Sequence, residues 1–332
     1  MRLATYNVEW FDHLFDDHGR LRDDGGWSGR YDVTRREQTA ALGHVFAALD
    51  ADAVMIIEAP DSSRRRDGAV ALESFARHFG LRTNKALIGY VNDTQQEIAL
   101  LYDPDTVTAE HDPQEDATAP RFDQAFHFDL DTDATPETIR WSKPPLEVAL
   151  QTGGASLRLI GVHAKSKAPH GARNNAHAIR LSIENRRKQL AQCIWLRRRV
   201  QAHLEAGDPL IVLGDFNDGP GLDEYEKLFG RSGVEVVLGE GDGIQLFDPH
   251  ARIALSSRIG VQPATARFKK PDGPYLSALL DYIMVSPDLR QPDSAWRIWH
   301  PFDDPQCFSD LDLREALLTA SDHFPVTLDL AL

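Results

Sequence analysis

Basic residues, cysteines and long apolar runs are the features that this sequence has least of. Its 36 lysines and arginines stand against 51 aspartates and glutamates, which gives 332 residues a formal net charge of −15. This excess of acid opposes non-specific electrostatic binding of nucleic acid, because such binding needs a basic surface. It does not exclude a nuclease that has a local basic groove.

The two cysteines, Cys193 and Cys307, lack the spacing of a metal site, and one pair cannot build a disulfide framework. Two buried thiols are expected, with a single bridge as the alternative. No signal-peptide pattern precedes the first strand, and no apolar run approaches the length of a membrane span. These absences predict a cytoplasmic protein that contacts no membrane and has no obligate protein partner.

A linker or a low-complexity stretch is also missing. The chain exceeds the usual size of one domain. However, its chemistry-bearing motifs are spread over the full length, so that no half would hold a complete site. We therefore expect one domain over residues 1–332.

What the sequence does have is polar side chains at the ends of apolar strands. The run 210–212 leads into Leu-Gly-Asp-Phe-Asn-Asp at 213–218 and predicts a buried strand that ends at a site. Asp215 and Asn217 should point the same way and Phe216 the opposite way. A carboxylate beside an amide suits a site for a hard cation and a phosphate. The alternative is a strand followed by an ordinary Asp-Gly-Pro turn.

Other strand-like segments carry the same kinds of side chain. A lone polar residue at a strand end is usually structural, but a whole set is hard to attribute to coincidence. The set consists of Asn7, Glu58, His163, Asp281, Asp322 and His323.

In this order the motifs resemble the endonuclease/exonuclease/phosphatase superfamily, the DNase I-like group. The resemblance covers nearly the whole chain and implies an α/β fold, a four-layered α/β sandwich of two mostly antiparallel β-sheets packed face to face with helices outside. It also implies a divalent-metal phosphodiesterase or phosphatase site at one edge. The motifs are Tyr-Asn-Val-Glu (6–9), Ile-Ile-Glu (56–58), Gly-Val-His (161–163), Gly-Asp-Phe-Asn (214–217), Leu-Asp-Tyr-Ile (280–283) and Ser-Asp-His-Phe-Pro-Val (321–326).

Hydrophobic patterns predict the elements themselves. Strands are expected near 2–9, 53–58, 97–103, 145–151, 156–163, 210–215, 280–286 and 324–330, and helices at 34–49, 68–79, 176–205 and 222–229. The basic clusters 186–188 and 197–199 are expected on a solvated helix face, with substrate binding as the alternative. The acidic segment 103–133 is expected to be a solvated loop.

Hydrolysis of a phosphoester needs a metal ion, an activated water and donors for the growing charge. Glu58 is predicted as the principal metal ligand, with Asn7 and Asp322 completing the shell directly or through water. Mg²⁺ is the expected ion because it suits an oxygen-rich shell that retains waters. Mn²⁺ should substitute, and Ca²⁺ is a further alternative.

His323 is the predicted general base. The neighbouring Asp322 should point away from it, so Asp281 on another strand is the predicted partner that fixes its tautomer. Asp215 and Asn217 are placed at the scissile phosphate, Asn217 as a donor and Asp215 to orient water or assist proton transfer. Which of these groups activates the water stays open.

His163 resembles the histidine of the DNase I-like and sphingomyelinase-like branches, where a glutamate before an earlier strand orients the ring. Glu97 matches that place, with an exposed glutamate at a strand start as the alternative. Lys143 stands where the family has an arginine, and it would supply charge without a bidentate fork. Further basic residues near these motifs are candidate substrate contacts: Lys165, Lys167, Arg173, Arg267, Lys269 and Lys270.

Three functions compete. A metal-dependent nuclease acting on DNA or RNA is favoured by His163 and the basic loop after it. A phosphatase or phosphodiesterase for a small-molecule or lipid phosphoester is the alternative, favoured by the acidic net charge, although no apolar hairpin suited to a membrane is evident. A non-catalytic binding module should have lost a core residue, and none of the set is missing.

Overall fold

The computed structural model describes residues 1–92, 94, 96–129, 137–169, 171–219, 230–239, 241, 243–256, 262–269 and 273–332. The helix expected at 222–229 and Lys270 lie outside these ranges. The main strands are β1 (Arg2–Asn7), β2 (Ala53–Pro60), β3 (Lys85–Ile88), β4 (Gln96–Tyr102), β5 (Thr108–His111), β8 (Leu146–Thr152), β9 (Ala155–His163), β10 (Leu210–Asp215), β13 (Asp281–Val285), β14 (Ala295–Ile298) and β15 (Val326–Asp329). Two short hairpins add β6 (Phe126–Phe128) with β7 (Glu137–Ile139) and β11 (Ala266–Lys269) with β12 (Tyr275–Ala278).

Helices connect the strands. They are α1 (Arg35–Leu49), α2 (Gly68–His78), α3 (Asn175–Ala206), α5 (Gly233–Leu238), α6 (Pro249–Ser256), α7 (Pro305–Ser309) and α8 (Leu311–Ala320), with 3-10 turns at Phe11–Leu14 and Pro287–Leu289. Each strand predicted from the sequence is present within a few residues, as are the first three predicted helices.

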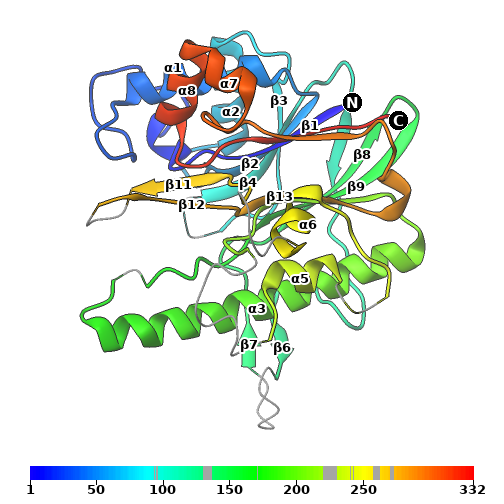
Figure 1. The fold of residues 1–332 in the computed structure, drawn as a ribbon. Coiled ribbons are helices and arrows are strands. Elements are labelled where there is room, and N and C mark those ends of the chain that lie inside the picture. Colours follow the sequence, from blue (N-terminus) through cyan, green and yellow to red (C-terminus); the bar gives the residue numbers. More distant parts are fainter. Residues whose placement is uncertain are drawn as a thin grey trace.

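The main strands form two sheets (Figure 1). A six-stranded sheet has the order β14-β15-β1-β2-β4-β3, and a five-stranded sheet has the order β13-β10-β9-β8-β5. Within each sheet one pair is parallel, β1 with β2 and β9 with β10, and the remaining pairs are antiparallel. The prediction of mostly antiparallel sheets is therefore confirmed.

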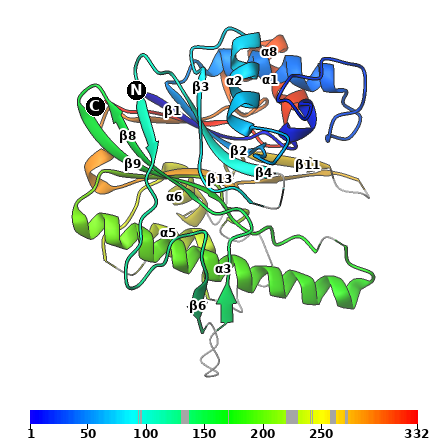
Figure 2. The same cartoon turned by 180° about the vertical axis from the view of Figure 1, so that it is seen from behind.

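Apolar side chains alternate between the two faces of each strand and so build three large cores, beside a small cluster at the β11–β12 hairpin. On β2, Ile56 faces the layer of α1, α2 and α8, whereas Met55 and Ile57 face the other sheet. The second sheet packs its outer face against α3, α5 and α6. The resulting order of helices, sheet, sheet and helices, seen from behind in Figure 2, is the predicted four-layered sandwich.

A glycine on β9 lets the two sheets approach closely. A β-carbon at Gly161 would overlap the sulfur of Met55, which comes from the facing sheet. Any side chain there would push the sheets apart or displace Met55 from the shared core. This close contact lies two residues before His163, so it helps to fix the position of that strand end.

The expectation of a solvated basic helix face is wrong for part of α3. Arg186 is buried and donates to Asp218 at 3.0 Å, and Lys167 approaches the same carboxylate at 2.5 Å. Arg199 is also buried and lies 3.1 Å from both Asp116 and Glu147. A run of charged residues on a helix indicates a surface position. The pattern cannot show that these arginines pair with buried carboxylates from distant parts of the sequence.

The acidic segment 103–133 is likewise more structured than expected. Within its described part it contains β5 and β6, and Asp103 is buried against Arg82 at 2.9 Å. Cys193 and Cys307 are free, buried thiols, as expected. None of the helices in the described residues combines the length and apolarity needed to cross a bilayer.

Arg186→Ala should lower the free energy of unfolding by about 3–5 kcal/mol, because it removes the fully buried one of the two cations that pair with the buried Asp218. The midpoint of urea denaturation, followed by circular dichroism, measures this loss. The matched control is Arg20→Ala, which breaks an exposed pair with Asp16 and should cost less than about 1 kcal/mol. Equal effects of the two variants would show that the buried network contributes no more than a surface pair.

Candidate active site

The polar strand ends predicted from the sequence meet at one edge of the sandwich. In the second sheet, Asp215 is directly opposite His163 on one side and Asp281 on the other. In the first sheet, Asn7 ends β1 and is paired with Ile57, the residue before Glu58. The two parallel pairs thus end at the same place, which puts the polar residues of both sheets together.

Asp215 joins the two sheets. Its carboxylate accepts hydrogen bonds from the side chain of Asn7 at 3.0 Å, and from the backbone and side chain of Asn217 at 2.7 and 3.1 Å. Burial raises the pKa of Asp215 to about 7; Asp281 raises it further, while His323 and the hydrogen bonds lower it. Gly214 precedes it with a φ of +134°, and a β-carbon there would overlap the Val162 carbonyl. Only glycine fits this approach.

Asn217 is held by the chain itself. Its amide nitrogen donates to the Ala164 carbonyl at 3.1 Å as well as to Asp215. The predicted common direction of Asp215 and Asn217 is present, and Phe216 packs the other way against Tyr282. In this arrangement the amide hydrogens of Asn217 brace the loop after β9, rather than pointing freely at a phosphate as expected.

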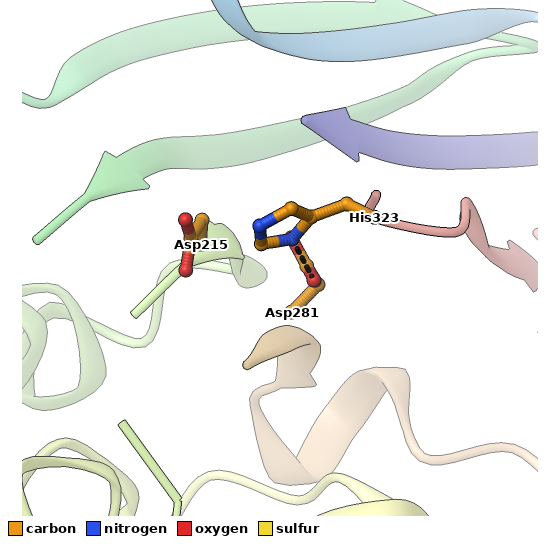
Figure 3. A group of neighbouring side chains, drawn as sticks. All are labelled: Asp215, Asp281 and His323. Atoms are coloured by element: carbon orange, nitrogen blue, oxygen red, sulfur yellow. Dashed lines mark hydrogen bonds and ion pairs between the residues drawn. The ribbon is translucent and has the colours of Figure 1, made fainter. Parts of the chain in front are cut away.

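His323 forms the predicted pair with Asp281. Its Nδ1 lies 2.8 Å from Asp281 Oδ2, and the other ring nitrogen points toward Asp215 (Figure 3). Burial lowers the pKa of His323, but the charges of Asp281, Asp215 and Asp322 outweigh it and hold the pKa well above its usual value. The hydrogen bond fixes the tautomer that leaves Nε2 available for proton transfer.

Two hydroxyl residues position this pair, and the sequence analysis gave neither a role. Ser321 Oγ donates to the Asn7 carbonyl at 2.7 Å and accepts from the His323 backbone at 3.1 Å. Thr265 Oγ1 accepts from the backbone of Leu280 and Asp281 at 2.9 and 3.0 Å. Ser321 lies inside a quoted motif and could have been suspected, but Thr265 lies outside every motif.

Glu58 lies on the opposite side of the site, with its backbone strained to place it. Its φ is +63°, at the irregularity in the pairing of β2 with β4. One oxygen, Oε2, accepts from the backbone of Trp10 at 3.1 Å and from the side chain of Gln96 at 2.6 Å. The other, Oε1, lies 3.9 Å from Lys143 Nζ and 4.0 Å from His163 Nε2. Positive φ at a non-glycine residue is costly and marks functional sites.

Two places could hold a cation. The side chains of Asp215, Asp281 and His323 offer ligand atoms within 4.8 Å of one another, but each residue is at most 5% exposed. Three donors already occupy Asp215, and Nδ1 of His323 is used by Asp281. By contrast, the Glu58 side chain is 15% exposed, and its Oε1 accepts no hydrogen bond from the described residues. A carboxylate with one such oxygen, on the strand paired with that of Asn7, fits a hard divalent cation better.

Asp322 faces a different carboxylate from the one expected. Its backbone nitrogen donates to Glu9 Oε2 at 3.0 Å, and no hydrogen bond joins it to Asn7 or Glu58 within the described residues. Burial raises the pKa of Glu9 to about 7, and the adjacent Asp322 raises it further, while Arg30 lowers it. Glu9 belongs to the first motif but received no role, so the site has one carboxylate more than predicted.

Glu97 does not contact His163 in the way the resemblance implied. Its carboxylate accepts from the side chain of Asn92 at 2.7 Å, and burial raises its pKa to about 7. The neighbour of His163 Nδ1 is Lys143 Nζ, at 3.3 Å. Burial lowers the pKa of His163 well below its usual value, and the positive charge of Lys143 lowers it further. Gln96, one residue earlier, is the residue of β4 that reaches the site.

The predicted basic contacts separate into different environments. Lys167 is half-buried against Asp218, away from the expected open loop. Lys165 is tied through its backbone to Gln192 at 2.9 Å, and burial lowers the pKa of its ammonium, as does the charge of Lys188. Lys188, assigned to a solvated face, therefore lies close to Lys165. Arg173 is exposed in the loop just before α3.

The sequence matches the model of a family described as the endonuclease/exonuclease/phosphatase family, over residues 4–323. Truncated TDP2 of Caenorhabditis elegans shares 12% identity and a TM-score of 0.53, covering 100% of this chain and 97% of that one. D. rerio TDP2 complexed with single strand DNA product shares 11%, with a TM-score of 0.51 and coverage of 100% and 99%. The 3′ phosphatase NExo from Neisseria, bound to a product DNA hairpin, shares 14%, with a TM-score of 0.51 and 100% of both chains covered. At these identities the likeness shows the fold. No curated protein matches the sequence.

Glu58→Gln should weaken binding of Mn²⁺ by more than the roughly 10- to 100-fold that loss of an outer partner of a metal site causes. The amide can still accept from Trp10, so the fold is retained while the charge is lost. Isothermal titration calorimetry measures the affinity. Glu110→Gln, the same change at an exposed position of β5, is the control and should bind like the wild type. Unchanged affinity in Glu58→Gln would place the ion elsewhere.

Proposed function

Because the chain belongs to the endonuclease/exonuclease/phosphatase family, a family of metal-dependent phosphoester hydrolases, we propose that it hydrolyses phosphodiester bonds of DNA or RNA. The observation that carries this proposal is the His323–Asp281 pair, which lies beside Asp215 and across the site from Glu58. A proton-transfer pair facing a candidate cation ligand is the arrangement that attack by water on a phosphate requires.

Glu58 and Asn7 are the residues that we propose to hold the cation, with Asp322 and Glu9 acting through water. Mg²⁺ is the proposed ion, with Mn²⁺ able to replace it. When bound, the ion would neutralise charge on the phosphate and polarise the bond that breaks. Gln96 and the Trp10 backbone fix the orientation of the Glu58 carboxylate through its other oxygen.

In this proposal the neutral form of His323, which its raised pKa restricts to higher pH, accepts the proton of the attacking water at Nε2. Asp281 holds Nδ1 and stabilises the imidazolium that forms, which is the role of the carboxylate in other histidine–carboxylate pairs. Asp215 orients the water on the far side of the ring, since Asn7 and Asn217 fix its carboxylate from two directions. Lys143 and His163 face the same space and supply donors for the charge on the equatorial oxygens.

Two observations favour nucleic acid as the substrate: the cations beside the site, and the DNA bound to proteins of the same fold. Burial lowers the pKa values of Lys143 and Lys165. The charge of Lys165 lowers the pKa of Lys143 further, and that of Lys188 lowers the pKa of Lys165 further, a repulsion that is relieved when a polyanion binds. Two of the proteins with this fold were solved with DNA products. The net charge of −15 favours the alternative, a phosphatase or phosphodiesterase for a small phosphoester.

A substrate panel decides between these functions. In Mg²⁺ or Mn²⁺ the protein should cleave single-stranded DNA, RNA or plasmid faster than inositol phosphates, and EDTA should abolish cleavage. It should also hydrolyse bis-p-nitrophenyl phosphate slowly, because that diester fills only the reacting part of the site. Cleavage of the small phosphate esters alone would support the alternative function and contradict ours.

Variants of His323 and Asp281 test whether the activity measured in the panel comes from this site. His323→Ala and Asp281→Asn should each lower kcat by about 10²–10⁴-fold, and the double variant should lose little more, because the two act as a unit. His127→Ala, an exposed histidine on β6, should retain full activity. Additive losses would mean that Asp281 does not act through His323.

A further inference from the structure

A hairpin is attached directly to the residues around His323. Ala266 of β11 forms a bridge with His323, and the backbone of Arg267 donates to the Asp322 carbonyl at 2.8 Å. The Phe268 ring packs edge-on against the His323 ring, with centroids 5.6 Å apart. The hairpin of β11 and β12 projects from the body of the protein in both views (Figures 1 and 2). Its base is therefore fixed at the site, and its side chains extend the surface outward.

Both cations of β11 lie on aromatic rings. The guanidinium of Arg267 is 3.6 Å from the centre of the Tyr275 ring, and Lys269 Nζ is 5.4 Å from that of Tyr31. No carboxylate pairs with either cation among the residues that the structure describes. In a chain with a net charge of −15, where Arg2, Arg35 and Arg82 all pair with aspartates, this leaves a local positive surface beside the site.

The rings themselves are unusually open to solvent. Tyr31 is 85% exposed, Trp27 is 65% exposed and Tyr275 is 50% exposed. Trp27 and Tyr31 belong to the loop before α1, which the contact of Lys269 with Tyr31 places against the hairpin. Large aromatic side chains bury much apolar area when they pack, so several exposed together indicate a binding surface. We call the group Tyr31, Arg267, Lys269 and Tyr275 the aromatic surface.

We propose that the aromatic surface binds unpaired nucleotides of the substrate and leads them to His323. Bases of a single strand expose their flat faces and stack on aromatic rings, while lysine and arginine pair with the phosphates between them. In a duplex those faces are hidden within the base stack. This inference rests on the proposed function and narrows the substrate to nucleic acid with a single-stranded segment next to the bond that is cut.

The bridge between β11 and His323 fixes where the cations of the aromatic surface lie. Arg267 is one residue from the bridge to His323, and Lys269 is two residues further along β11. Residues two apart on a strand point to the same face, so the two cations line one face of the hairpin at successive distances from its base, the face opposite to the one on which Phe268 contacts His323. A bound strand would therefore run along the hairpin with its phosphates on this row of cations and its bases on the rings.

The test compares Tyr31→Ala and Tyr275→Ala with the wild type on three substrates: a single-stranded oligonucleotide, the same sequence as a blunt duplex, and bis-p-nitrophenyl phosphate. Each variant should raise KM for the single strand about 5- to 150-fold, the equivalent of about 1–3 kcal/mol per stacked base. Hydrolysis of the small diester should not change, because it does not reach the hairpin.

Matched variants separate stacking from other effects. Tyr31→Phe and Tyr275→Phe keep the ring and should behave as the wild type. Phe128→Ala removes a ring that also lies under an arginine, 5.1 Å from Arg198, but on the β6–β7 hairpin at the far end of the molecule. It should leave KM for the single strand unchanged. Equal loss in the alanine variants on all three substrates would mean a structural role and would overturn the proposal.

Strand binding measured in EDTA, without cleavage, tests this inference separately from the proposed catalytic function. Fluorescence anisotropy of a labelled single strand should show weaker binding by both alanine variants even if the wild type cleaves no nucleic acid. In that case the proposed function fails, and what stands of the inference is that the aromatic surface binds single strands. If the wild type cleaves nucleic acid while the alanine variants bind and cut the single strand normally, or if the duplex is affected as strongly, the inference fails alone. Absence of strand binding by the wild type would assign the surface to another partner, such as a protein, and would also overturn it.

Discussion

A single hydrogen bond between the two sheets, from Asn7 to Asp215, defines where the site can form. Asn7 ends β1 and Asp215 ends β10, so each ends one strand of the parallel pair in its own sheet. The core that the two sheets share below these residues fixes how the sheets meet. Because the sheets pack face to face, residues more than 200 positions apart in sequence become neighbours. The proposed cation ligands Asn7 and Glu58 come from the first sheet, and Asp215 and Asp281 come from the second, whereas His323 stands just before β15 of the first sheet and reaches across to Asp281.

Strained backbone is concentrated at this junction. Glu9, Trp10, Glu58 and Asn217 all have positive φ values. Such conformations cost about 1–3 kcal/mol each and persist only where the surroundings determine them. The surroundings here are buried and polar: Asp218, next to Asn217, is held by Arg186 and by the hydroxyl of Tyr282 through its carbonyl at 3.0 Å. The interior network on α3 thus stabilises the loop that carries Asn217.

The sequence predicted the strands and the residues at their ends, because alternation of apolar residues and the motifs are both local. It did not predict Glu9, Gln96 or Thr265 as parts of the site. The contacts of Glu9 depend on a strained turn, those of Gln96 on a bulge and those of Thr265 on a hairpin. Arg186 and Arg199 were assigned to the surface because their partners are 32 and 83 residues away in sequence. Pairing of charges over such distances has no local pattern.

The position of the cation tests most directly whether the metal ligands are separate from the proton-transfer group. Crystals grown with Mn²⁺ and measured at a wavelength where manganese scatters anomalously would locate the ion without reference to activity. We expect a peak about 2.0–2.6 Å from a Glu58 carboxylate oxygen, the range of Mg²⁺ and Ca²⁺ distances. A peak among Asp215, Asp281 and His323, with none at Glu58, would contradict it, because those three residues would then bind the metal and could not act as the proton-transfer group.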